Sequence, residues 1–205
     1  MRSLLSPKWI FLLFFVLLSG LLVVRRFDMP TQESVQLVSS TGSEQTVGHL
    51  YKRGEMITTK PGEHLFIQIG NDVSVAIDER TSLELWRISE KERVLRFPRG
   101  RIVVEKTGGT PVRIETNQTE NTLVKGKTIF INFDFLQSVT IAPVVGSIQT
   151  HIKGTEEYMV LPLPISIKET TPPVLSKIST SPTEGASAAF HAWADLQFDQ
   201  RVKNP

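Results

Sequence analysis

Gly126-Lys127-Thr128 is the string most similar to a chemical motif, the end of a phosphate-binding loop. Such a loop needs a further glycine five positions before its second one, and Asn121 stands there instead. It also needs a following helix, whose N-terminus helps to hold the phosphates. The run from Ile129 to Phe133 has the alternation of a strand instead. We therefore interpret Gly126 to Thr128 as a tight turn without nucleotide affinity.

Other residues that could perform chemistry lack a supporting pattern. Asp78 and Glu79 could form half of an acid/base pair, but a charged turn between two strands is a far commoner arrangement. No Gly-x-Ser-x-Gly elbow is present. The histidines share no metal-binding spacing: His49, His64, His151 and His191. We predict no catalytic, metal-binding or cofactor-binding residues and no cofactor, and we expect a protein that is not an enzyme.

Composition narrows the classes of partner. The chain has 205 residues and a formal net charge of +2, and its Lys and Arg residues form no stripe, so nucleic acid is not an expected partner. It contains no cysteine, which excludes disulfides, thiolate nucleophiles, cysteine zinc sites and lipid attachment to cysteine. Asn117-Gln118-Thr119 fits the N-glycosylation sequon, which matters only in a host that glycosylates.

An apolar run, Trp9 to Val24, precedes the rest of the chain. About sixteen residues at about 1.5 Å each give roughly 24 Å, and flanking apolar residues can extend the run toward the thickness of a bilayer. A cleaved signal peptide is the alternative, but Arg25 and Arg26 follow the run directly and favour an uncleaved anchor. We predict a cytoplasmic N-terminus (1–8), a transmembrane anchor (9–26) and a linker (27–34). Charge alone leans only slightly toward that orientation.

The body from 35 to 169 has a β pattern. Short apolar segments alternate with turn residues every eight to twelve positions, and no amphipathic helix of ten residues interrupts them. Gly70-Asn71-Asp72 separates two alternating runs, as in a hairpin or a solenoid corner, and Glu90 to Arg93 is interpreted as a solvated turn. The predicted interior positions are Leu65, Ile67, Val73, Val75, Leu83, Ile102, Val104, Ile114, Ile129, Ile131, Val139 and Ile141.

An ordered series of segments in this body resembles the FecR-type domain, the extracytoplasmic module of bacterial membrane-bound sigma-factor regulators. The segments are Leu50 to Thr59, the hairpin from Leu65 to Ile77, Thr81 to Leu85, Phe97 to Ile102, Pro111 to Thr116, Thr122 to Phe133 and Ser138 to Ile148. The resemblance implies an all-β, elongated and twisted β-solenoid-like domain on the periplasmic side of the inner membrane. It therefore supplies an orientation: single-pass, with the C-terminal domain in the periplasm or outside the cell.

The chain departs from these regulators at both ends. At most eight residues precede the apolar run where the family has a cytoplasmic anti-sigma domain, and the tail is too short for the C-terminal signalling domain. Gly126-Lys127 also stands where the family has Gly-Thr. We expect the domain type and its location to carry over, rather than the signalling output.

The tail, 170–205, admits two interpretations. After the proline-rich linker at Thr170 to Pro173, Val174 to Ser179 and Ala188 to Trp193 resemble the first strands of a fibronectin-III or immunoglobulin-like repeat. The alternative is a helix, since Ser181 to Glu184 forms a capping box and Ala186 to Ala194 has high helix propensity. We favour the strands.

These patterns favour a structural or protein-interaction module of the bacterial envelope. The expected partners are the lipid bilayer, through the N-terminal helix, and an envelope protein or peptidoglycan. Two alternatives stay open: a transmembrane regulator that passes an extracytoplasmic signal to a membrane partner, and a small-ligand-binding domain.

Overall fold

A computed structural model describes residues 14–15, 19, 32–133, 136–178 and 183–203. The chain divides into two compact units, Met1–Thr31 and Gln32–Pro205, and everything below concerns the second. Most of the predicted anchor, 9–26, lies outside the described residues. Among those that are described, no helix combines the length and apolar composition needed to cross a bilayer. On the described residues, the predicted single-pass anchor and the inner-membrane localisation that depended on it are therefore not borne out.

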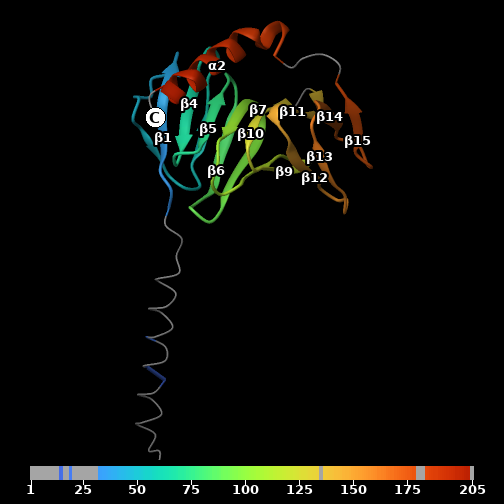
Figure 1. Ribbon diagram of the computed structural model, residues 1–205, viewed down its shortest axis with the longest axis horizontal. Helices are drawn as coiled ribbons and strands as arrows, with labels where there is room; N and C mark the ends of the chain where they lie inside the picture. The colour runs from blue at the N-terminus through green and yellow to red at the C-terminus, as the bar shows by residue number, and fades with distance from the viewer. Residues whose placement is uncertain (1–13, 16–18, 20–31, 134–135, 179–182, 204–205) are drawn as a thin grey trace, which may run out of the picture. The chain divides into compact units, whose positions relative to one another are not determined.

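The described residues of the second unit form fifteen strands in two layers that share β7 (Arg93–Lys106) (Figure 1). Layer 1 contains, in spatial order, β2 (Leu50–Tyr51), β1 (Val35–Thr41), β4 (His64–Ile69), β5 (Val73–Ile77), the second half of β7, β10 (Gly126–Phe133), β11 (Ser138–Gly146), β14 (Ile165–Lys168) and β15 (Val174–Lys177). Layer 2 contains β3 (Met56–Thr58), β6 (Ser82–Ile88), the first half of β7, β8 (Val112–Glu115), β9 (Thr119–Leu123), β12 (Ile148–Ile152) and β13 (Tyr158–Leu161).

The all-β class and the hairpin at Gly70-Asn71-Asp72 are confirmed, but the solenoid is wrong. A solenoid stacks successive coils in parallel, whereas every strand pair here is antiparallel except β7 with β8. The pairings also join strands that are distant in sequence, such as β9 with β12. The chain forms one open sheet, folded so that its two halves face each other.

The change of layer occurs within β7, at Arg99 and Gly100. Arg99 pairs with β6 in layer 2, and Gly100 pairs with Asn132 of β10 in layer 1. Gly100 has a φ of 110°, and a Cβ there would lie 2.3 Å from the Thr81 hydroxyl, so this bend requires glycine. The change of layer is therefore a bend inside one continuous strand.

The main core fills the space between the two layers, and ten of the twelve predicted interior residues lie in it. The exceptions, Ile129 and Ile131, face the opposite side of layer 1, and Phe130 occupies the core in their place. The alternation in β10 was therefore assigned to the wrong face. Both faces of that strand are apolar because layer 1 is covered on both sides, so the pattern does not identify the core face.

A helix covers the outer face of layer 1 (Figure 1). After β15, the chain forms a short 3₁₀ turn, η2 (Gly185–Ser187), and then α2 (Ala188–Lys203), which packs on β4 and β5. The second tail strand, predicted from Ala188 to Trp193, is therefore wrong, although β15 forms as expected. Phe190, Ala194 and Phe198 recur every four residues and present one apolar stripe to the sheet, which stabilises the helix.

Candidate functional site

The outer face of layer 1 is organised as rows of side chains across neighbouring strands. In the middle row are Phe66, Ala76, Val103, Ile129 and Ala142, which occupy matched positions on β4, β5, β7, β10 and β11. This row is apolar and buried, and the stripe of α2 packs on it. It is a second, smaller core that fixes the helix over the sheet.

A charged cluster flanks this row at the beginning of β4. Asp78 lies 2.7 Å from Arg101 and 3.1 Å from Nδ1 of His64, and the backbone N–H of Glu79 donates to the same carboxylate. Burial raises the pKa of Asp78, and the N–H of Glu79, Arg101 and His64 oppose this increase. The His64 ring also contacts Trp193 of α2, with ring centroids 5.4 Å apart. These groups attach the start of the helix to the sheet.

A polar row lies on the other side, beyond the apolar one. Gln68, Ser74, Glu105 and Lys127 occupy matched positions on β4, β5, β7 and β10. Ser74 donates to Gln68, and Arg201 at the end of α2 donates to Ser74. Burial raises the pKa of Glu105, and the positive charges of Lys127 and Arg201 oppose the increase. This row therefore attaches the C-terminal end of the helix.

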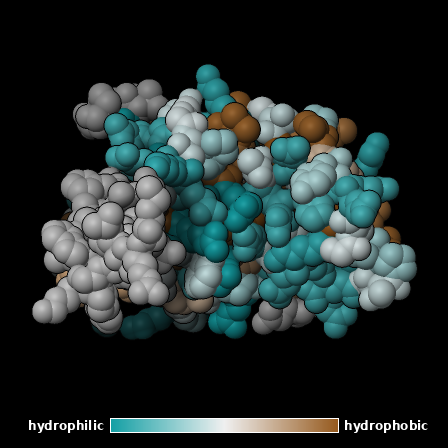
Figure 2. Space-filling view, turned by 90° about the horizontal axis from the view of Figure 1, so that it is seen from below, coloured by the Kyte–Doolittle hydropathy of each residue, from teal (hydrophilic) through white to brown (hydrophobic). Residues whose placement is uncertain are grey.

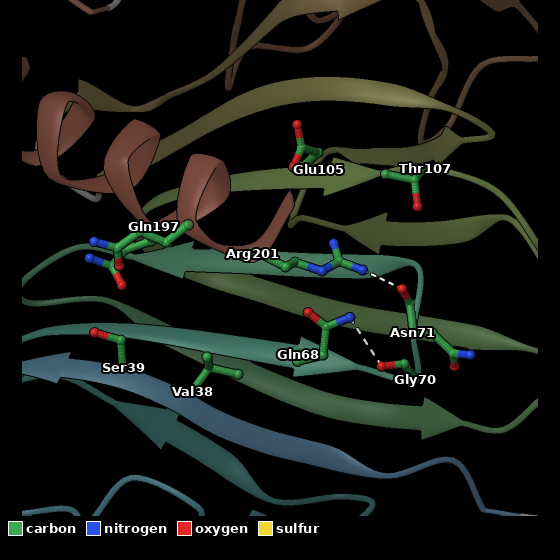
Figure 3. A pocket seen from close by; sticks show the side chains of 10 residues that line it. Val38, Ser39, Gln68, Gly70, Asn71, Glu105, Thr107, Gln197 and Arg201 are labelled. Carbon is green, nitrogen blue, oxygen red and sulfur yellow. Dashed lines mark hydrogen bonds between the residues drawn. The ribbon is translucent and has the colours of Figure 1, made fainter. Parts of the chain in front are cut away.

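Between that end of α2 and the strands lies a cleft of about 830 Å³, the α2 cleft (Figure 3). The guanidinium of Arg201 points to the Asn71 carbonyl at the β4–β5 turn and donates to it, while Gln68 donates to the Gly70 carbonyl at 3.0 Å. The other walls are polar or small side chains: Ser39, Glu105, Thr107, Gln197 and Gln200, together with Val38. The α2 cleft is lined by hydrogen-bonding groups but by no aromatic side chain.

A second cleft, of about 930 Å³, adjoins the first at Glu105 and Thr107. Three valines line it, one at the β9–β10 bend, one near the end of β11 and one in β13. We call it the valine cleft. Val124, Val145 and Val160 are 59%, 60% and 66% exposed, so most of each side chain faces solvent. Lys125 and Lys127 also contribute to the walls. Seen from below the view of Figure 1, the surface is mostly hydrophilic, with separate hydrophobic patches (Figure 2).

A third group of charges is buried at the end of the hairpin. Arg93 lies 2.6 Å from Glu33 and 2.8 Å from Asp72, and Lys106, whose side chain is 0% exposed, lies 2.7 Å from Asp72. Burial lowers the pKa of Lys106, and the negative charge of Glu33 opposes this decrease. Two cations face two carboxylates, so the cluster is neutral and ties the β4–β5 turn and the residues before β1 to β7. The interpretation of Arg93 as part of a solvated turn is therefore wrong.

The structure also places the residues that the sequence analysis considered for chemistry. Gly126 to Thr128 begin β10, whereas the bend is at Val124 and Lys125, so the predicted turn is displaced by two residues. Lys127 lies 2.6 Å from Asp195 of α2 and 4.3 Å from the centre of the Phe198 ring. Its amine therefore holds the helix.

The four histidines are dispersed. Nε2 of His151 lies 2.8 Å from the Thr155 carbonyl and its ring stacks on Tyr158, while His49 lies beside Tyr51. Across the described ranges, no group of three or more His, Asp or Glu side chains is arranged to hold a metal ion. His64, paired with Asp78, contributes to an ionisable cluster with a clear structural role.

Sequence reasoning missed both clefts. The three valines lie 15 to 36 residues apart in the chain, in or just after strands that also contain buried apolar residues such as Leu123, Ile141 and Leu161. A signal was available for α2, because apolar residues recur every four positions from Phe190 to Phe198. That signal identifies the helix but not the clefts beside it.

Comparisons with known proteins give a likeness of fold. Two crystal structures, at 2.50 and 1.65 Å resolution, of a "putative anti-sigma factor" from Parabacteroides distasonis match with TM-scores of 0.52. Identities are 15% and 14%, and each match covers 60% of this chain and 59% of the other. No protein-family model and no curated protein matches the chain. The likeness to regulators of the anti-sigma class is thus supported at the level of fold, while membership of the FecR family is not shown.

Proposed function

We propose that this domain is a regulatory module that acts by binding a polypeptide partner in the valine cleft, and that it is not an enzyme. The observation that carries the proposal is the convergence of Val124, Val145 and Val160, all more than half exposed, in one concavity. Fully burying a valine stabilises a complex by about 1.5 to 3 kcal/mol, and contiguous exposed apolar groups mark interaction sites. Because each of the three valines is only partly exposed in the free protein, a partner that covers it gains part of this free energy.

The anti-sigma-like fold supports the regulatory part of this proposal. Proteins called anti-sigma factors are regulators, and a module with that fold and an exposed apolar cleft is suited to recognising another protein. The chemistry of the cleft supports the non-catalytic part. Two of its three lysines are directed to structural partners, Lys106 to Asp72 and Lys127 to Asp195, and its one carboxylate, Glu105, belongs to the polar row beside α2.

Site-specific photo-crosslinking in the source cells tests the proposal. A photoreactive residue would replace Val124, Val145 or Val160 in turn, with Lys91 in the exposed turn between β6 and β7 as the matched control. We expect all three valine positions to label the same protein and Lys91 to leave it unlabelled. The proposal is contradicted if the valine positions label no common protein, or if Lys91 labels that protein equally well.

A second candidate function is binding of a small polar ligand in the α2 cleft. Its volume of about 830 Å³ is within the range of about 300 to 1,000 Å³ that ligand pockets occupy. Gln197 and Gln200 offer amide donors and acceptors at its wall. Thermal-shift screening against a panel of sugars, amino acids and dicarboxylates tests it. A stabilising compound whose effect disappears in Gln197→Ala supports this function, and no shift with any compound counts against it.

A further inference from the structure

The strand β13 lies at the edge of layer 2 and pairs, among the described strands, only with β12. Met159 packs against the main core and Leu161 lies in it, while Tyr158 and Val160, both 66% exposed, point outward. Its other edge leaves backbone N–H and C=O groups without a strand partner, a ready template for a further strand. The described part of the chain has other edge strands, but Val160 makes β13 the one that forms a wall of the valine cleft.

We infer that the polypeptide partner adds to β13 as an antiparallel strand and places apolar side chains in the valine cleft. The inference rests on the proposed function and specifies the conformation of the partner. Strand addition gives affinity through main-chain hydrogen bonds and specificity through alternate side chains. The pairs β8–β9, β9–β12 and β12–β13 are all antiparallel, so an antiparallel addition continues the existing pattern of this layer.

Charges at the two ends of β13 specify the direction and composition of the added strand. Lys125, which is exposed, lies in the valine cleft with Val160. The other cleft lysines already have carboxylate partners. At the opposite end, Glu156 and Glu157 are exposed just before Tyr158, and the nearby Lys153 donates to the Thr116 carbonyl. The cleft end is therefore positive and the beginning of β13 is negative.

An antiparallel partner has its N-terminal part beside the end of β13 and its C-terminal part beside the beginning. We therefore expect an acidic residue at its N-terminal side, β-branched residues at alternate central positions, and a basic residue at its C-terminal side. Opposite charges on facing strands are favourable and like charges are not. A peptide with this order of charges is therefore disfavoured in the parallel direction, which would place like charges beside each other.

The test begins with selection of short random peptides displayed on phage against the protein, followed by fluorescence anisotropy with synthetic copies. We expect a consensus with the composition given above, and a loss of affinity of about tenfold or more in Val160→Asp. The matched control is Val174→Asp on the edge strand β15, also half-exposed but outside the cleft, which should bind as the wild type does. N-methylation of the peptide amides that face β13 should weaken binding about as much, and methylation of the alternate amides should not.

Hydrogen exchange separates this inference from the proposed function. Bound peptide should slow amide exchange in β13, because its outward N–H groups gain partners. If binding is lost in Val145→Asp but tolerates every N-methylation and leaves β13 exchange unchanged, the cleft binds peptides and strand addition is wrong. If no peptide is enriched, or binding survives both Val145→Asp and Val160→Asp, the proposed function fails as well.

Discussion

Removing the Phe198 ring should release α2 from the sheet. The ring is almost fully buried, packs edge-on against Phe66 with centroids 5.1 Å apart and lies 4.3 Å from Nζ of Lys127. Replacing a buried Phe by Ala typically costs about 3 to 5 kcal/mol. At a urea m-value of about 2 kcal/mol/M, that cost lowers the unfolding midpoint of Phe198→Ala by about 2 M. The matched control is Leu196→Ala, since Leu196 is 53% exposed and a surface change alters stability by only about 0.5 kcal/mol.

The assay combines urea unfolding with hydrogen exchange, because the helix can detach without unfolding of the sheet. The loss of stability is then limited to the free energy that holds α2 in place, and exchange accelerates in α2 while the strands of the main core stay protected. A loss of global stability and a local detachment of α2 both agree with this packing. Equal effects of Phe198→Ala and Leu196→Ala, with α2 exchange unchanged in both, would refute the assignment of Phe198 to the second core.

Three further experiments test other parts of the structure. Phe130→Asp should prevent folding by placing a charge in the main core, whereas Ile131→Asp, at a half-buried site under α2, should cost less, as urea unfolding will show. Glu105→Gln should become more stable relative to the wild type as pH rises above the ordinary Glu pKa of 4.5. Burial raises the pKa of Glu105, so the wild-type protein loses stability when this carboxyl ionises, whereas the glutamine variant does not. Urea titrations at about pH 4 and about pH 7 will measure this difference. Arg93→Met should cost about 3 to 5 kcal/mol, because two carboxylates then face Lys106 alone, and thermal unfolding should detect the loss.

The strands and most of the core were predictable because local alternation is a sufficient signal for them. Leu65, Ile67, Val73 and Val75 lie at alternate positions on both sides of a clear turn, so their common burial follows from period two. The same reasoning failed at Phe130, where apolar residues occupy both faces. Local periodicity does not reveal a helix that covers the second face of the sheet.

The arrangement of the strands required information that alternation does not contain. Pairing of β7 with β8 in parallel, and of β9 with β12 across more than twenty residues, depends on loop paths and on the bend at Gly100. The buried cluster of Arg93 and Lys106 shows the same limit. In the sequence, each of these two residues is most simply interpreted as a solvated charge. Only the fold brings the carboxylates of Glu33 and Asp72 to Arg93 and Lys106.

The valine cleft extends this argument to function. In the sequence, Val124, Val145 and Val160 are ordinary strand residues that no pattern separates from the buried valines around them. They become a site because the β9–β10 bend, the end of β11 and the edge strand β13 meet at one corner, which leaves each valine more than half exposed. Burial of the same three side chains inside the domain would have increased its own stability. Their exposure beside an unpaired strand edge therefore favours a surface that another polypeptide completes.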